Sequence, residues 1–229
     1  MPTIRDLGLL AAAVYDENPA VSGWSSPGHL RASGAFSGFQ AATFVRDGMT
    51  IVVYRGTAQT MDVAADVKLG AGMNSTYFSA GEDYLASVQP VGPIWVCGHS
   101  LGGAIAQVVA NRRNVPMITF NAPGVAVFAS REIGQANLPM AAVRTAGMLV
   151  SSLRHPMQAY RDVRSTFHTV RGMNICLEND AVSQIGLHYG EVVRIRGTSS
   201  NPLTEHRMAT VNQVLATNPI GARDLLTLR

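Results

Sequence analysis

The stretch IWVCGHSLGGAIAQVVA, residues 94–110, is the feature that most constrains the fold of this chain. An apolar, β-branched run meets Gly98-His99-Ser100-Leu101-Gly102, and the residues that follow have helical spacing. A strand that leads directly into a helix requires a sharp turn, in which a bulky residue at position 98 or 102 would clash. Such a turn would expose the Ser100 hydroxyl at the carboxyl edge of a sheet, although a glycine-rich connection without chemical function has the same pattern.

Strands and helices alternate along the whole chain, which predicts an α/β fold with a mostly parallel central sheet flanked by helices. The expected helices are 3–15, 59–70, 75–89, 101–113 and 202–216, with a helical insert at about 126–166. The expected strands are 36–48, 49–57, 93–98, 115–124, 167–180 and 191–197, and Asp47-Gly48 predicts a hairpin between the first two. Residues 19–34 are rich in Ser, Gly and Pro and are expected to form a loop. No repeat or long linker divides the chain, so a single domain over residues 1–229 is predicted.

The composition is that of a globular chain with a large core. Hydrophobic residues make up 47% of the sequence and charged residues 14%, which excludes a disordered or fibrous chain. The net charge of +3 is mild and no block of basic residues is present, so no nucleic-acid partner is expected. Cys97 and Cys176 lie in apolar, strand-like runs and are expected to be buried free thiols rather than a disulfide. No Cys or His cluster has the spacing of a metal site, so no metal is predicted.

The N-terminal segment raises the question of localisation. Residues 7–14 form a short apolar run, which we interpret as part of an amphipathic helix, because the basic region that precedes a signal peptide is poor. No run of about 18 uninterrupted apolar residues occurs, so no transmembrane segment is expected. The sequence predicts a protein that is cytoplasmic, or secreted by a route other than a cleaved N-terminal signal.

Ser100 needs two partners if it is a nucleophile. A serine hydroxyl attacks only when a base removes its proton and an acid orients that base. In a sheet of this type the order along the chain is serine, acid, histidine. Asp180 follows a predicted strand end, and His206 comes after a further strand and a loop. We therefore predict Ser100 as nucleophile, Asp180 as acid and His206 as base.

The other candidate acids and bases fit less well. Glu178 is the second choice for the acid, but it lies within the strand end and is expected to point elsewhere. His188 follows the acid too closely and is interpreted as structural or as a pocket wall. His155 and His168 precede the acid and are interpreted as surface or packing residues. His99, beside the serine, is interpreted as packing the turn.

Attack on a carbonyl also requires two preplaced donors for the oxyanion. The main-chain N–H of Leu101, directly after the serine, is one candidate. The strand end VVYRGT offers the other at Thr57, through its main-chain N–H and its hydroxyl, although an ordinary strand-end turn has the same sequence.

The runs VVYRGT, GHSLGGAIAQ, TFNAPG, NDAVSQIG and EHRMATV stand in the order found in the class 3 lipases, and roughly residues 40–215 resemble that family. The resemblance implies an α/β-hydrolase fold, the triad Ser100, Asp180 and His206, and an oxyanion hole at Thr57 and Leu101. It implies hydrolysis of carboxylic esters of acylglycerols or phospholipids, without a cofactor. The run NDAVSQIG is also similar to small bacterial lipase-like effectors. Some of these are secreted toxins, and a toxin would have an immunity or delivery protein as partner.

Two alternatives use the same residues differently. The same triad serves a thioesterase or an amidase, because the site chemistry is shared. A hydrolase fold also occurs as a non-catalytic interaction module, although the presence of every expected site residue argues against it.

Residues 128–171 are unusually basic. They hold two acidic residues and six arginines: Arg131, Arg144, Arg154, Arg161, Arg164 and Arg171. The segment is either a helix pair with a solvated arginine face, or a cover that makes peripheral contact with anionic lipid.

Overall fold

The computed structural model describes residues 1–31, 39–56, 75–125 and 170–228. Within these residues, seven strands form one sheet in sequential order. They are β1 (Ser25–Arg31), β2 (Gln40–Arg46), β3 (Met49–Tyr54), β4 (Ile94–His99), β5 (Met117–Phe120), β6 (Gly172–Leu177) and β7 (Glu191–Ile195). The first three strands pair antiparallel, and β3 to β7 pair parallel. The sheet is therefore mostly parallel, as the alternating pattern predicts.

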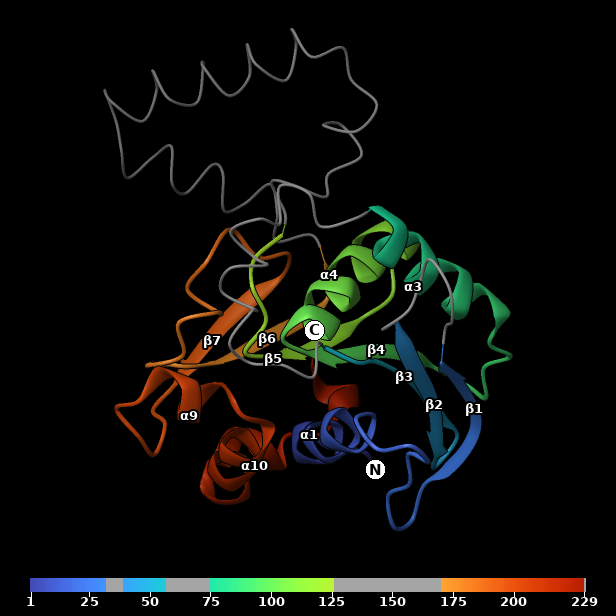
Figure 1. Ribbon diagram of the computed structural model, residues 1–229. Helices are drawn as coiled ribbons and strands as arrows, with labels where there is room; N and C mark the ends of the chain where they lie inside the picture. The colour runs from blue at the N-terminus through green and yellow to red at the C-terminus, as the bar shows by residue number, and fades with distance from the viewer. Residues whose placement is uncertain (32–38, 57–74, 126–169, 229) are drawn as a thin grey trace, which may run out of the picture.

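Helices cover both faces of the sheet. Two helices, α3 (Ser75–Ser87) and α4 (Leu101–Arg113), lie on one face, and α1 (Ile4–Ala13) and α10 (Met208–Thr217) lie on the other (Figure 1). A short helix, α9 (Pro202–His206), precedes α10, and two 3-10 helices, Pro219–Ala222 and Leu225–Thr227, follow it. Parallel strands between two helical layers, with the serine turn directly after β4, form the predicted α/β-hydrolase fold.

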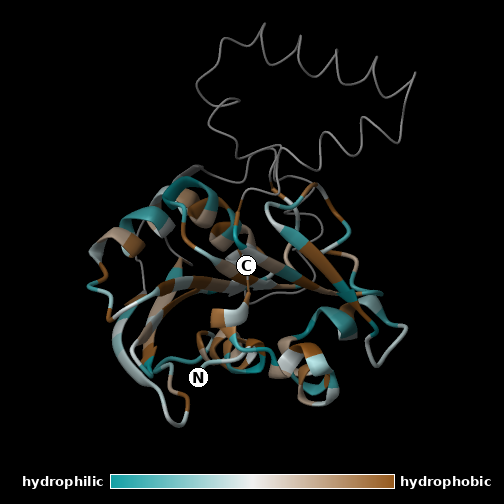
Figure 2. Cartoon of the chain, turned by 180° about the vertical axis from the view of Figure 1, so that it is seen from behind, coloured by the Kyte–Doolittle hydropathy of each residue, from teal (hydrophilic) through white to brown (hydrophobic). Residues whose placement is uncertain are grey.

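The central strands are apolar along most of their length because both of their faces are buried. All six residues of β3, MTIVVY, are buried. Ile51 and Val53 belong to the core beneath α1 and α10, whereas Val52 and Tyr54 belong to the core beneath α3 and α4. This continuous apolar pattern is typical of strands covered on both sides. In Figure 2 hydrophobic residues recur along the strands and on the helices that cover them.

The first helix begins at a capping box. The Thr3 hydroxyl accepts from the main-chain N–H of Asp6, and the Asp6 carboxylate accepts from the main-chain N–H of Thr3. Ile4, Leu7 and Leu10 are fully buried in the core that α1 shares with α10. The helix expected over 3–15 is therefore confirmed. None of the described helices combines the length and the hydropathy that crossing a bilayer requires.

The three strands that follow the first helix confirm one prediction and correct another. Asp47 (φ 51°) and Gly48 (φ 69°) both have positive φ and connect β2 to β3, so the predicted hairpin is confirmed. The loop expected over 19–34 is wrong in part, because β1 lies within it. This strand has the sequence SSPGHLR, and among the described strands it pairs only with β2, so Pro27 lies in an edge strand, where proline is tolerated. Its register shifts between Ser25 and Gly28, as at a β-bulge.

The closing helix differs from its prediction. A single helix was expected over 202–216, but Arg207 has extended backbone (φ −71°, ψ 139°) and separates α9 from α10. The break comes directly after His206. Two other expected features, the helix over 59–70 and the insert at 126–166, lie outside the described residues. Cys97 and Cys176 are free and buried, as expected.

Candidate active site

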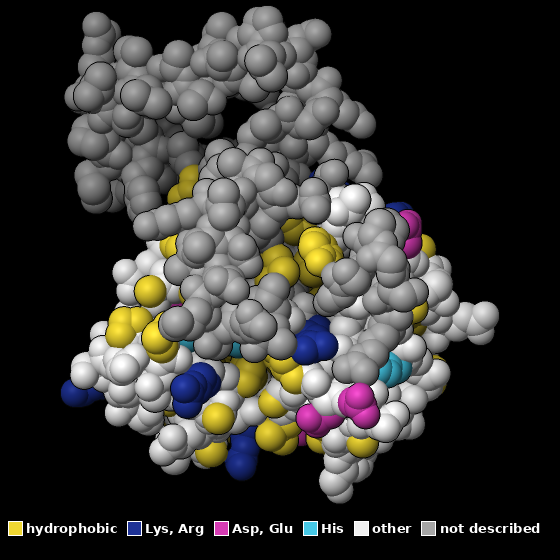
Figure 3. Space-filling model, in the orientation of Figure 1, with side chains coloured by type: hydrophobic (Ala, Val, Ile, Leu, Met, Phe, Trp, Pro, Cys, Tyr) yellow, Lys and Arg dark blue, Asp and Glu magenta, His cyan; other side chains and the backbone are white. Residues whose placement is uncertain are grey.

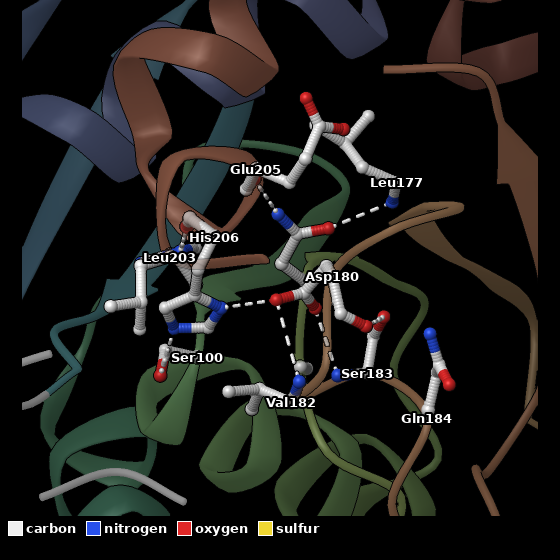
Figure 4. A network of polar contacts seen from close by, with 12 residues as sticks. Ser100, Leu177, Asp180, Val182, Ser183, Gln184, Leu203, Glu205 and His206 are labelled. Carbon is white, nitrogen blue, oxygen red and sulfur yellow. Dashed lines mark hydrogen bonds and ion pairs between the residues drawn. The ribbon is translucent and has the colours of Figure 1, made fainter. Parts of the chain in front are cut away.

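Ser100 occupies the turn between β4 and α4. Strand β4 ends at His99 and α4 begins at Leu101, so Ser100 alone makes the connection. Its backbone has φ 54° and ψ −126°, a combination that non-glycine residues rarely adopt. The turn places the Ser100 side chain next to the His206 ring (Figure 4).

Glycines allow this turn to close. A Cβ added to Gly98 would lie 2.3 Å from main-chain atoms of Gly102. A Cβ added to Gly102 would lie 2.1 Å from the main-chain oxygen of Tyr54 in β3. Both contacts involve main chain, which cannot move aside as a flexible side chain would. The requirement for glycine at both positions, predicted from the sharp turn, therefore has a direct steric cause.

His206 lies against the serine. Its Nε2 is 2.9 Å from Ser100 Oγ, and its Nδ1 is 2.7 Å from Asp180 Oδ1. Asp180 is fully buried, and Ser100 and His206 are almost fully buried. The three residues come from three different places in the chain: the turn after β4, the loop after β6 and the end of α9. The structure brings together the three side chains that the sequence singles out (Figure 4).

The Asp180 carboxylate is held in its charged form. Oδ2 accepts a hydrogen bond from the main-chain N–H of Ser183 at 2.8 Å, and Oδ1 accepts from that of Val182 at 3.4 Å. Burial alone would raise the pKa of Asp180, but the hydrogen bonds and charge of His206 and the contacts of Ser183 outweigh it and lower the pKa. An ionised Asp180 accepts from Nδ1–H of His206, which leaves Nε2 unprotonated and facing the serine hydroxyl.

The candidates ranked lower lie elsewhere. Glu178 is exposed directly after the end of β6, and the carboxylate that contacts His206 Nδ1 is that of Asp180. His188 is half-buried, and its Nε2 is 2.9 Å from the main-chain oxygen of Ala122. His155 and His168 lie outside the described residues. His99 is buried at the turn, and its ring centroid is 4.8 Å from that of His206.

The start of α4 supplies main-chain donors beside the serine. The N–H groups of Leu101, Gly102 and Gly103 are in the first turn of a helix, where no intrahelical acceptor exists. The N–H of Ser100 itself donates to the main-chain oxygen of Phe120 and is not available. Thr57 lies outside the described residues. Its neighbour Gly56 lies beside the turn, because a Cβ on Gly56 would be 3.3 Å from Ser100 Cβ.

Asn121 is a site residue for which the sequence predicted no function. It follows β5 directly, has a φ of 44°, and its buried side chain reaches two other parts of the site. Its Nδ2 donates to the main-chain oxygen of Glu205 at 2.8 Å, and its Oδ1 accepts from the N–H of Leu177 at 2.9 Å. A polar residue at a strand end within TFNAPG was the available signal. No side-chain cluster that could hold a metal occurs among the residues the structure describes.

Known proteins resemble parts of this chain. It is 27% identical over 143 residues to an extracellular phospholipase A1 of Serratia liquefaciens, an alignment that covers 56% of this chain and 44% of that protein. It is 49% identical over 51 residues to the putative lipase ATG15 of Eremothecium gossypii, which covers 21% of this chain and 9% of that protein. The chain thus matches less than half the length of these curated relatives.

The Lip2 lipase of Yarrowia lipolytica is a solved structure similar to this one, with a TM-score of 0.49 and 16% identity over 92% of this chain and 88% of that one. The family model of the Tle-like phospholipase domain matches residues 7–161. That range includes Ser100 and Leu101 and ends before Asp180 and His206. Because the match covers more than half of the sequence, this chain belongs to the Tle-like phospholipase domain family.

Proposed function

We propose that this protein hydrolyses carboxylic ester bonds of phospholipids through an acyl-enzyme on Ser100. The observation that carries the proposal is the unbroken series of contacts from Ser100 Oγ through His206 to the buried Asp180. The choice of phospholipid is supported by the family and by the similarity to an extracellular phospholipase A1.

The first half of the reaction uses the protonation states given above. His206 Nε2 takes the proton of Ser100 as Oγ bonds to the ester carbonyl carbon, and the imidazolium that forms is stabilised by the Asp180 carboxylate. The carbonyl oxygen becomes an oxyanion, for which we assign the main-chain N–H of Leu101 and a donor at Thr57. The carbon–oxygen bond then breaks, His206 gives its proton to the departing lysophospholipid oxygen, and the acyl group stays on Ser100.

The second half regenerates the enzyme. A water molecule gives one proton to His206 Nε2 while its oxygen bonds to the acyl carbon. When the tetrahedral intermediate collapses, the fatty acid leaves and Ser100 Oγ recovers a proton from His206. Only the phospholipid and one water molecule are consumed, and Ser100, His206 and Asp180 return to their starting states.

The test compares wild type with Ser100→Ala on vesicles of phosphatidylethanolamine and phosphatidylglycerol, with mass spectrometry of the products. Wild type should release fatty acid and lysophospholipid in equal amounts, and Ser100→Ala should release neither. Parallel incubations with a triacylglycerol, an acyl thioester and an acyl amide of equal chain length distinguish the neighbouring activities. Turnover of one of these in place of phospholipid would change the substrate assignment. Failure of Ser100 to react with a fluorophosphonate probe would overturn the serine hydrolase itself.

We also propose that the basic segment 128–171 brings the enzyme to anionic lipid. On the face in Figure 3 the described Lys and Arg side chains are scattered rather than gathered, so the described part of that face offers no basic patch. The densest basic sequence is the 128–171 segment, of which only Val170 and Arg171 are described. Replacing Arg144, Arg154 and Arg161 with Ala should weaken binding to phosphatidylglycerol vesicles, and unchanged binding would contradict this proposal.

A further inference from the structure

The break between α9 and α10 leaves main-chain oxygens of the His206 turn without helical partners. In a continuous helix the oxygens of Glu205 and His206 would accept from N–H groups four residues later. Here the Glu205 oxygen accepts from Asn121 Nδ2, and the His206 oxygen lies 2.7 Å from His99 Nε2. Two buried side chains from distant parts of the chain therefore replace the helical N–H donors at His206, the residue that we assign as the base.

His99 is fixed from both ends of its ring. Its Nδ1 is 2.9 Å from the hydroxyl of Tyr15, which follows α1, and the two rings meet edge to face. Its Nε2 contacts the His206 main-chain oxygen, and its buried ring lies beside the His206 ring, with 4.8 Å between the ring centroids. Each ring nitrogen thus has one polar partner, and neither partner is solvent.

The directions of these hydrogen bonds follow from the chemistry of the partners. A main-chain oxygen only accepts, so His99 Nε2 must carry the proton and Nδ1 must accept from the Tyr15 hydroxyl. The Tyr15 oxygen in turn accepts from the main-chain N–H of Gly56. A single line of donors runs from Gly56, beside the predicted oxyanion residue, through Tyr15 and His99 to the His206 main chain. Bonds aligned in this way strengthen one another.

Burial, together with the neighbouring His206, lowers the pKa of His99 to about 3. The imidazole is therefore neutral throughout the range in which a histidine base works. The tautomer is then set by its two partners and does not change with pH.

We propose that His99 is a positioning residue for His206, through its Nε2–H bond to the His206 main-chain oxygen, and that Tyr15 fixes the tautomer that makes this bond. The inference rests on the proposed function, since it assigns His206 as the base. A residue that only packed the turn would need shape and apolarity but no donor at Nε2. The difference between the two explanations is thus a single N–H group.

Two substitutions of His99 distinguish a positioning role from a role in packing the turn. The amide nitrogen of Gln extends about as far as imidazole Nε2, whereas that of Asn reaches only as far as Nδ1. We expect His99→Asn to lower kcat about tenfold or more with KM changed less than about twofold, because the base is displaced while binding is kept. His99→Gln should recover most of that loss. Tyr15→Phe keeps the ring and should lower kcat about threefold.

The control is Gln107→Met, which removes a buried amide that donates to the main-chain oxygen of Pro123 at 2.8 Å and accepts from the main-chain N–H of Tyr189 at 3.1 Å. Neither partner belongs to the His206 turn. This control should lower the Tm without lowering kcat. Equal kcat values for His99→Asn and His99→Gln would overturn the proposal. It would also be overturned if Gln107→Met lowered kcat together with the Tm, because kcat would then follow stability alone. If His99→Asn does not fold, wild-type kcat in Tyr15→Phe overturns it instead.

The rate of Ser100 labelling by a fluorophosphonate distinguishes the two levels of inference. A wild-type protein that is not labelled contradicts the proposed function, and the positioning inference falls with it. A labelled wild type whose His99→Asn variant is labelled equally fast contradicts the positioning inference alone. The expected result is rapid labelling of wild type and His99→Gln and slow labelling of His99→Asn.

Discussion

Asn121 donates a hydrogen bond from Nδ2 to the main-chain oxygen of Glu205, at 2.8 Å, from the end of β5 to the residue before His206. The same side chain accepts from the N–H of Leu177, the last residue of β6. One amide therefore joins the strand that leads to Asp180 with the turn that carries His206. Its two ends fix the separation of the two residues that we assign as acid and base.

Asn121→Asp tests this arrangement, because it keeps the acceptor for Leu177 and removes the donor to Glu205. The new carboxylate oxygen would face a main-chain oxygen, so the free energy of unfolding should fall by about 1–3 kcal/mol. We expect kcat to fall about tenfold, since His206 would move relative to Asp180. Urea denaturation and steady-state kinetics measure the two effects.

The matched control is Asn179→Asp. Asn179 donates from Nδ2 to the main-chain oxygen of Ser199 at 2.9 Å, but it is exposed. Its free energy of unfolding should change by less than about 0.5 kcal/mol. If Asn121→Asp and Asn179→Asp show the same stability and the same kcat, the hydrogen bond from Asn121 to Glu205 does not position the His206 turn.

Asp180→Asn should nearly abolish turnover while preserving the shape of the site. An amide that points its NH₂ group at His206 Nδ1 would force the proton to Nε2, where it blocks acceptance from Ser100. A loss in kcat of about 10⁴ is the expected magnitude. Kinetics on a soluble p-nitrophenyl ester measure it, and a loss of less than about tenfold would contradict the assignment of Asp180.

The stability of the protein should depend on pH through the same carboxyl. The pKa of Asp180 in the folded state is lowered from its value in the unfolded chain, chiefly because the contacts of His206 and Ser183 outweigh burial. A lowered pKa contributes stability that is complete above the unfolded value of about 3.9 and is lost as pH falls through the folded value. The difference in free energy of unfolding between wild type and Asp180→Asn should thus become smaller below about pH 5. Urea titrations between neutral and acid pH check this, and a constant gap would contradict it.

The sequence predicted the parts of this fold that depend on local rules. Helix α4 begins and ends where its spacing indicates, because a strand, a glycine turn and an apolar helix follow one another without interruption. The hairpin at Asp47-Gly48 follows from residues that tolerate positive φ. Asp180 and His206 could be proposed as partners of Ser100 because the carboxyl ends of parallel strands meet at one edge of the sheet.

The features that the sequence did not predict depend on contacts between distant residues. Nothing local ends the helix at His206, since Glu205, His206 and Arg207 are compatible with a helix. It ends where Asn121 and His99, both far away in sequence, take its main-chain oxygens. Strand β1 is not predicted for a related reason, because Pro27 and Gly28 indicate a loop unless their segment pairs with a neighbouring strand as the edge of a sheet.

Ser100→Gly and Ser100→Ala should differ in stability although both lack the nucleophile. Both variants remove Oγ, so the lost bond to His206 cancels in the comparison. The backbone at position 100, with φ 54° and ψ −126°, strains any residue that has a Cβ. We expect Ser100→Gly to be more stable than Ser100→Ala by about 1 kcal/mol, after allowance for the greater freedom of glycine in the unfolded chain. A more stable Ala variant in urea denaturation would show that the turn carries no strain.

Gly98→Ala and Gly102→Ala should prevent the turn from closing. The added Cβ atoms would meet main chain at 2.3 Å and 2.1 Å, and neither β4 nor β3 can shift without disturbing the parallel pairing between them. We expect each variant to lose at least about 3 kcal/mol of the free energy of unfolding, or to remain unfolded. Gly28→Ala in the edge strand β1 is the control, because its Cβ would lie 3.3 Å from the Tyr84 hydroxyl, the end of a side chain that can move. Circular dichroism and urea denaturation compare the three, and a folded Gly102→Ala variant as stable as Gly28→Ala would mean that the close approach of α4 to β3 is not required for the fold.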